Sequence, residues 1–332
     1  MATADPSYVD PPRDQPPQVE AGRPLVLTPT PLEPAPRLSQ ALGLSPDQVW
    51  LKRDDLAGLG GGGNKLRKLE VSLAEARKVG ADILVTTGAA QSNHARLTAA
   101  VAARAGLNAV LVLAGDEPAD RRGNLLLDEL LGAHVVWAGE LEGSDLGAGL
   151  SARADEVVAE LRQSGRTPYL VPYGGTSPTT AEGYVAAARE LEEQLPDLSH
   201  VVVAVGSGGT MAGLVRQLGP TKVLGVDTGA VADPRATVAG LLAEMGRGLE
   251  PASLRLDHDH VGEGYGALVP TVREAVELVA RTEGVLLDVT YVGRAAAGLV
   301  AGVRSGLIRP GAKTVLMHTG GLPGLFGHPA LG

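Results

Sequence analysis

The chain has 332 residues, of which 44% are hydrophobic and only 3% aromatic, and it contains no cysteine. This length predicts roughly two domains of about 150 residues each. The scarcity of aromatic residues predicts a core of Ala, Val and Leu. Without cysteine, disulfides, thiolate nucleophiles and thiolate metal sites are excluded. The net charge of −9 disfavours contact with phosphate backbones and anionic lipids, so we expect neither nucleic acid nor membrane as a partner.

The first 23 residues are rich in Pro, Asp and Gln and have little apolar surface to bury. This composition predicts a mobile arm or an extended strap. No stretch reaches the roughly 18 uninterrupted apolar residues of a membrane span, and the chain does not begin with a basic segment followed by an apolar one. We therefore expect a cytoplasmic protein.

Short apolar runs rich in β-branched residues recur along the chain, and segments of helical period follow them. The predicted strands are residues 82–87, 109–113, 134–137, 169–171, 201–205, 223–226 and 314–317. The predicted helices are residues 93–105, 124–131, 146–163 and 181–194. This alternation predicts an α/β fold with parallel sheets.

The alternation also predicts how the chain divides. Residues 67–172 form a self-contained run of strands and helices, so we expect an inserted smaller α/β domain. Residues 24–66 and 173–332 then form the larger domain. Ligand sites in such folds lie beyond the carboxyl ends of the strands and between domains. The loops that follow the predicted strands are therefore the candidates for function.

Residues 60–65 read Gly-Gly-Gly-Gly-Asn-Lys and stand directly before a segment of helical period. Glycine permits close approach of the backbone to a ligand. Lys65 could bind a phosphate, act as a Schiff-base nucleophile, or be a solvated residue of a first helical turn. The phosphate loop of nucleotide-binding proteins needs Gly-Lys followed by Ser or Thr, so that motif is absent.

Residues 88–94, Gly-Ala-Ala-Gln-Ser-Asn-His, lie at a predicted junction between a strand and a helix. Such a junction presents free backbone N–H groups and the positive end of the helix, which suits a carboxylate or phenolate oxygen. A plain helix cap by Ser92 or Asn93 would explain the same residues. His94 could equally be a structural histidine.

Residues 206–210, Gly-Ser-Gly-Gly-Thr, follow the predicted strand 201–205 and enter a helix. Glycines and hydroxyls in this position are typical of a phosphate site, and tight turning is the simpler alternative. The dinucleotide fingerprint Gly-x-Gly-x-x-Gly is not matched, because Met211 stands where the third glycine would be.

The sequence His-Thr-Gly-Gly at residues 318–321 directly follows the last predicted strand, and an ordinary glycine turn is its simplest interpretation. Tyr265 and Tyr291 stand out in a chain with few aromatic residues. A lone tyrosine usually packs its ring, but the glycines on both sides of Tyr265 favour a loop position over a core position.

Two other kinds of site, a metal centre and a serine hydrolase nucleophile, find little support in the sequence. His258 and His260 flank Asp259, which raises the alternative of a metal site. Zinc needs three or four ligands and no further ligand spacing is recognisable, so we expect no metal. The Gly-x-Ser-x-Gly elbow is absent from the sequence, which removes the commonest signature of serine hydrolases.

Taken together, these loops resemble those of the D-cysteine desulfhydrase and 1-aminocyclopropane-1-carboxylate deaminase family. That family is dependent on pyridoxal phosphate and shares the two-domain fold of the tryptophan synthase β subunit, fold type II, with parallel-rich sheets flanked by helices. The resemblance runs from about residue 24 to residue 325. Its motifs are residues 52–56 (Lys-Arg-Asp-Asp-Leu), 60–70, 91–94, 174–176 (Gly-Gly-Thr), 206–210, 264–266 (Gly-Tyr-Gly), Tyr291 with Gly293, and 318–321.

The resemblance implies pyridoxal 5'-phosphate as the cofactor and Lys65 as the lysine that holds it as a Schiff base. Asn93 would bond the ring hydroxyl oxygen, and Thr319 the ring nitrogen. The cofactor phosphate would lie on the loop formed by Gly206, Ser207, Gly208, Gly209 and Thr210. The cofactor acts as an electron sink, and the protein orients the bond to be broken.

The resemblance also implies the residues on the substrate side. Ser92, with backbone groups around Asn93 and His94, would bind the substrate carboxylate, and Ser92 would also serve in proton transfer. Tyr265 and Tyr291 match the two active-site tyrosines of the family. A lysine with an ordinary pKa of about 10.4 is a poor nucleophile, so the site must favour the neutral form of Lys65.

Within the family, the cyclopropane-opening members resemble one another in three positions. They carry Glu after the second tyrosine, Gln after Ser-Asn, and Leu in the C-terminal glycine motif, where this chain has Val292, His94 and Thr319. This favours β-elimination of D-cysteine to pyruvate, sulfide and ammonia. Desulfhydrases usually read Asp-Pro-x-Tyr-Thr-Gly-Lys around the second tyrosine, whereas Val289, Val292 and Arg294 replace Pro, Thr and Lys here.

Several alternatives stay open at the level of sequence. They are a 1-aminocyclopropane-1-carboxylate deaminase, β-elimination or β-replacement on another amino acid such as L-cysteate, and a catalytically silent carrier of pyridoxal phosphate. In each case the resemblance implies a small amino acid as the ligand partner and a homodimer as the assembly.

Overall fold

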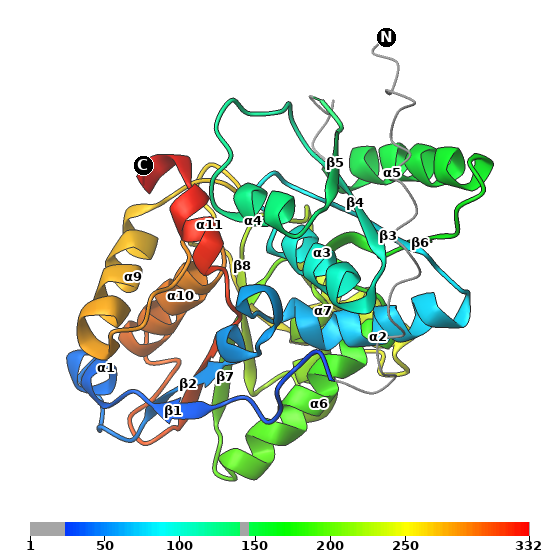
Figure 1. Cartoon of the computed structure of the whole chain (residues 1–332). Helices are drawn as coiled ribbons and strands as arrows, with labels where there is room; N and C mark the ends of the chain where they lie inside the picture. Colours follow the sequence, from blue (N-terminus) through cyan, green and yellow to red (C-terminus); the bar gives the residue numbers. More distant parts are fainter. Residues whose placement is uncertain (1–23, 140–145, 332) are drawn as a thin grey trace.

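The computed structural model describes residues 24–139 and 146–331, which form two sheets flanked by helices (Figure 1). The predicted N-terminal arm, residues 1–23, lies outside the described residues. Among the helices that are described, none is both long and apolar enough to span a bilayer.

The larger sheet has six strands. In spatial order they are β1 (Leu32–Pro34), β2 (Val49–Arg53), β10 (Thr314–His318), β7 (His200–Val205), β8 (Val223–Asp227) and β9 (Arg255–Asp257). Only β1 runs antiparallel to its neighbour, and the other pairs are parallel. The central strands read as continuous apolar runs because helices cover both faces of the sheet.

Helices from distant parts of the chain cover the two faces of this sheet. One face packs against α1 (Pro36–Ala41), α9 (Pro270–Glu283) and α10 (Val292–Arg304). The other packs against α6 (Pro178–Gln194), α7 (Gly209–Leu218) and α8 (Pro234–Glu244). Successive residues of β7 alternate between the two cores, with Val202 in the first and Val201 and Val203 in the second, as the two-residue period of a strand requires.

The smaller sheet has four parallel strands in the order β5 (His134–Trp137), β4 (Asn108–Leu113), β3 (Ile83–Gly88) and β6 (Pro168–Leu170). One face packs against α2 (Lys65–Lys78), α3 (Asn93–Ala105) and α4 (Asn124–Leu130). The other packs against α5 (Leu146–Gln163). The last helix, α11 (Leu322–Gly327), lies against α4.

The predicted α/β class is confirmed, and all the predicted strands and helices are present with small shifts of their ends. Strand β2 was not predicted, because Lys52 and Arg53 break its apolar pattern although Lys52 is fully buried. The division into domains stays a prediction. Its boundary at residues 66–67 falls inside the first turn of α2, which begins at Lys65.

A buried network of charges joins β2, α2 and α6. Arg67 Nη2 lies 3.0 Å from Asp54 Oδ1, and Arg67 Nη1 lies 2.7 Å from Glu190 Oε1. Lys52 Nζ contacts Glu190 Oε2 at 2.9 Å, and the Tyr184 hydroxyl donates to Asp54. Burial alone would raise the pKa of Asp54, but Arg67 and the donated hydrogen bonds hold it below its usual value. The network therefore keeps Asp54 ionised in the interior.

Replacing Arg67 by Met should lower the free energy of unfolding by about 3–5 kcal/mol, because the buried Asp54 would lose its ion-pair partner and Glu190 would keep only Lys52. The matched control is Arg121→Met, which removes an exposed arginine from Glu117 and Glu129 and should cost no more than about 1 kcal/mol. Urea unfolding followed by circular dichroism measures both. Equal losses in the two variants would contradict a special role for the buried network.

Candidate active site

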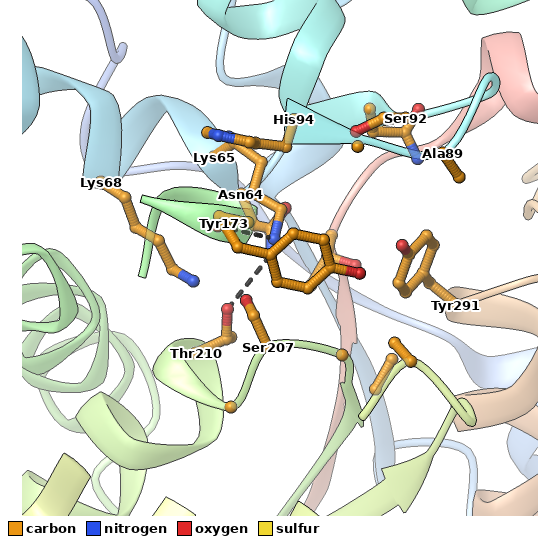
Figure 2. Close-up of a pocket in the computed structure, with 18 of the residues that line it drawn as sticks. Asn64, Lys65, Lys68, Ala89, Ser92, His94, Tyr173, Ser207, Thr210 and Tyr291 are labelled. Atoms are coloured by element: carbon orange, nitrogen blue, oxygen red, sulfur yellow. Dashed lines mark hydrogen bonds between the residues drawn. The ribbon is translucent and has the colours of Figure 1, made fainter. Parts of the chain in front are cut away.

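One pocket gathers the loops that follow β3, β7 and β10, together with the start of α2 (Figure 2). The predicted site residues that line it are Lys65, Ser92, Asn93, His94, Gly206, Ser207, Gly208, Thr210, Tyr265, Tyr291 and Thr319. Gly209 does not line the pocket, although its neighbours Gly208 and Thr210 do. The carboxyl ends of β7 and β10 meet because these parallel strands are neighbours at one edge of the larger sheet, and the carboxyl end of β3, in the smaller sheet, lines the same pocket.

Lys65 is the first residue of α2, and its amine points into this pocket. Its Nζ donates a hydrogen bond to the Gly174 carbonyl at 3.1 Å (Figure 2). Burial lowers the pKa of Lys65 to about 8, because a charged ammonium loses hydration there. The neutral, nucleophilic fraction of this amine near physiological pH is therefore much larger than that of an ordinary lysine, although the ammonium form still predominates.

The glycine run before Lys65 is held tightly from both sides. Gly62 has φ 73°, and a Cβ there would lie 1.8 Å from the Asp55 carbonyl oxygen, so only glycine fits. The fully buried Arg96 donates to the carbonyls of Gly60 and Gly62. The backbone N–H of Asn64 donates to the Thr319 carbonyl at 3.0 Å, and this bond joins the glycine loop to the end of β10.

The loop between β7 and α7 carries donor groups that would suit an anion, and we call it the anion cradle. The first N–H groups of a helix have no acceptor within it, and those of α7 begin at Gly209. Lys68 Nζ donates to Thr176 Oγ1 at 2.9 Å, and Thr176 in turn bonds Ser207 at 2.7 Å. A Cβ on Gly209 would lie 2.9 Å from Lys68 Nζ, so the amine approaches the loop closely.

The charge of Lys68 lacks an anionic partner. In residues 24–139 and 146–331, no carboxylate forms an ion pair with it, although its side chain is only 1% exposed. Burial lowers the pKa of Lys68 well below its ordinary value, and the neighbouring Lys65 lowers it further. A buried amine beside free N–H groups is the donor set that a phosphate group requires, so these residues fit such a ligand.

Ser92 caps α3, and its Oγ accepts a hydrogen bond from the Ala95 amide at 3.1 Å. The structure therefore confirms that Ser92 is a helix cap, one of the two roles that the sequence left open. Ser92 also lines the pocket, so capping does not remove it from the candidate site.

His94 is neutral and turned toward the two lysines. Burial lowers its pKa well below the ordinary value, and the charges of Lys65 and Lys68 add to this. His94 Nε2 lies 2.8 Å from the Thr86 hydroxyl, which in turn lies 3.2 Å from the Val171 carbonyl oxygen. The ring is thus held in place by Thr86.

Tyr265 and Tyr291 meet across the pocket, with their hydroxyl oxygens 2.6 Å apart. Burial raises the pKa of both phenols, so both are neutral. Asp288 holds Tyr291 by accepting from the backbone amides of residues 290–292. The buried Arg294 donates to four carbonyls around the loop that carries Tyr265, including Gly264 and Ala267 at 2.8 Å.

The region of His258 and His260 does not assemble a metal site. His258 Nδ1 bonds Asp227 at 2.9 Å, whereas His260 lies 3.5 Å from Asp257. In the part of the chain that the structure describes, no group of three or more metal-ligating side chains is found.

Some pocket residues escaped prediction from the sequence. Lys68 follows Lys65 by three positions, which places both on one side of a helix, and this spacing could have identified it. The sequence indicates no role for Asn64 beyond its place before Lys65, but its side-chain Nδ2 donates to the Thr210 hydroxyl at 3.1 Å (Figure 2). Tyr173 also lines the pocket, and no motif indicated it.

Comparisons with known proteins agree with this geometry. Residues 24–320 match the family described as pyridoxal-phosphate dependent enzymes. A D-cysteine desulfhydrase of Klebsiella pneumoniae is 41% identical over 326 residues, covering 92% of this chain and 96% of that protein. The crystal structure of a homologue of ACC (1-aminocyclopropane-1-carboxylate) deaminase matches with a TM-score of 0.82 and 37% identity, covering 92% of this chain and 93% of its own.

A more distant structure supports the fold alone. Processed threonine deaminase isoform 2 from Solanum lycopersicum matches with a TM-score of 0.63 at 20% identity, covering 89% of this chain and 80% of that one. The resemblance inferred from the loop motifs is thus confirmed. The chain belongs to the family of pyridoxal-phosphate dependent enzymes.

Proposed function

We propose that the chain is a pyridoxal phosphate-dependent lyase that converts D-cysteine and water to pyruvate, sulfide and ammonia. The observation that carries the proposal is Lys65, whose amine has a pKa of about 8 and shares one pocket with the anion cradle. The Klebsiella desulfhydrase, 41% identical across nearly the whole chain, supports the choice of reaction.

The residues of the pocket suggest how the cofactor would be held. Lys65 would bond its aldehyde, while Lys68 and the N–H groups at the start of α7 would bind its phosphate. Asn93 would lie at the ring hydroxyl oxygen and Thr319 at the ring nitrogen. When bound, pyridoxal phosphate withdraws electrons from a carbanion at the substrate Cα.

The remaining residues would bind the amino acid and move its protons. Ser92 and the N–H groups at the start of α3 suit the substrate carboxylate, because the positive end of this helix faces the pocket. Lys65 Nζ would take the proton from Cα. One hydroxyl of the Tyr265–Tyr291 pair donates to the other, and the second hydroxyl would donate a hydrogen bond to the departing sulfur.

A second candidate is the opening of 1-aminocyclopropane-1-carboxylate. The deaminase-homologue structure, 37% identical, favours it. Val292 argues for the desulfhydrase: it is fully buried at the start of α10, directly after Tyr291, and brings no carboxylate to the position where cyclopropane-opening members carry Glu. We also propose a homodimer in the cytoplasm, on the basis of the family resemblance alone; sedimentation velocity would test the dimer.

Purified protein loaded with pyridoxal phosphate should release pyruvate, ammonia and sulfide in equal amounts from D-cysteine. With 1-aminocyclopropane-1-carboxylate, kcat/KM should be at least about 100-fold lower, because a site built for one substrate's polar groups rejects another. L-Cysteine, L-cysteate and β-chloro-D-alanine complete the panel. A preference for the cyclopropane would establish the second candidate instead, and turnover of no substrate would indicate a silent carrier.

Lys65→Ala should lower turnover by at least about 1,000-fold, because it removes both the nucleophile and the base. Circular dichroism should show an unchanged fold, since among the described residues the Lys65 side chain has a single hydrogen bond, to Gly174. Turnover within tenfold of the parent protein would refute the assigned role.

The amine of Lys65 in the cofactor-free protein should titrate with a midpoint of about 8. Burial favours the neutral amine and therefore lowers its pKa. The reactivity of Lys65 should thus rise through about pH 8, whereas that of an exposed lysine side chain rises through about pH 10.4. Competitive acetylation between pH 6 and 11, with mass spectrometry of the Lys65 peptide, gives the curve. A midpoint at or above 10 would show that the pocket does not activate Lys65.

A further inference from the structure

The orientation of the Asn93 side-chain amide is determined by its neighbour Asn124, the first residue of α4. Asn124 is fully buried, and its Nδ2 lies 2.9 Å from the Gln91 carbonyl oxygen and 3.0 Å from Asn93 Oδ1. A backbone carbonyl can only accept, so the Asn124 atom facing it must be the amide nitrogen. The Asn93 atom facing that nitrogen must then be the oxygen. The amide nitrogen of Asn93 is left pointing elsewhere.

The side chain of Gln91 closes the same network and is fixed by the same logic. Its Oε1 accepts from the Asn124 backbone amide at 2.9 Å, and its Nε2 donates to the Arg122 carbonyl at 3.0 Å. Backbone groups thus fix the amides of Gln91 and Asn124, and Asn124 then fixes that of Asn93.

The network has no room to rearrange. A Cβ on Gly123 would lie 2.5 Å from Gln91 Oε1, and one on Gly327, in α11, would lie 2.2 Å from it. The loop before α4 and helix α11 therefore pack directly against the Gln91 amide. Asn124 itself does not line the pocket, so it can act there only through Asn93.

The amide nitrogen of Asn93 is available to a ligand. Asn93 lines the pocket at the first position of α3, and in the described ranges its Nδ2 donates to no protein acceptor. A donor here would stabilise an anionic ring oxygen, whereas the carbonyl oxygen of a flipped amide would repel it.

We infer that Asn124 is a positioning residue of the active site, which holds Asn93 so that its Nδ2 faces the cofactor's ring hydroxyl oxygen. The inference rests on the proposed function, because it assumes that the ring of pyridoxal phosphate lies against Asn93. Loss of Asn124 would allow the amide of Asn93 to turn over and would weaken this one bond selectively.

The test compares two ligands of the cofactor-free protein, pyridoxal phosphate and 3-deoxypyridoxal 5'-phosphate, which lacks only the ring hydroxyl. In Asn124→Leu, the dissociation constant of pyridoxal phosphate should rise about 10-fold to 100-fold, the effect of losing a hydrogen bond to a charged group. The constant of the deoxy analogue should change less than about threefold. Equal losses for both ligands would overturn the inference, because a merely structural residue cannot distinguish them.

Two further variants keep the result decisive. Asn124→Asp preserves shape while replacing the donor with an acceptor, and it should show the same selective loss if Asn124→Leu does not fold. Gln48→Leu is the matched control, because Gln48 is a buried amide with two backbone partners, Arg309 and Gly311, away from the pocket. It should leave both constants unchanged. If the parent protein bound neither ligand, the proposed function itself would fail, which is a different outcome from equal losses in the variant.

Discussion

The pairing of Arg67 with Asp54 and Glu190 is the interaction on which the geometry of the site depends. Arg67 lies in the first turn of α2, between Lys65 and Lys68, and it points away from the pocket into the protein interior. Because successive residues of a helix project in different directions, fixing Arg67 also fixes where the two lysines point. The buried charges are costly to desolvate and contribute little net stability as a set, but removing one member leaves the others uncompensated. The network thus specifies one orientation of α2.

The electrostatics of the pocket follow from that orientation. Two buried amines face one cavity, and burial lowers the pKa of both. Among the other titratable side chains of the pocket, His94, Tyr265 and Tyr291 are held neutral by burial. A site of this kind favours a ligand that brings negative charge to Lys68 and an electrophilic carbon to Lys65. Pyridoxal phosphate carries both, and the family match gives independent support.

The sequence allowed the α/β class, the main strands and the loops of the pocket to be predicted, because continuous apolar runs and glycine-rich strand ends are local signals. Strand β2 was missed since its buried Lys52 reads as a surface residue unless its partner Glu190, 138 positions away, is known. Lys68 had a usable local signal in its spacing from Lys65. Asn124 had none, because its importance arises only where α3 and α4 pack together. The roles of the site residues and the domain boundaries stay predictions.

The most direct measurement of the central claim is where the cofactor attaches. The protein would be loaded with pyridoxal phosphate, reduced with borohydride, digested and mapped by mass spectrometry. If Lys65 is the nucleophile and Lys68, which bonds Thr176 beside the loop before α7, is left to the phosphate, the pyridoxyl group should appear on Lys65 alone. Attachment to Lys68, or to scattered surface lysines in substoichiometric amounts, would contradict the account.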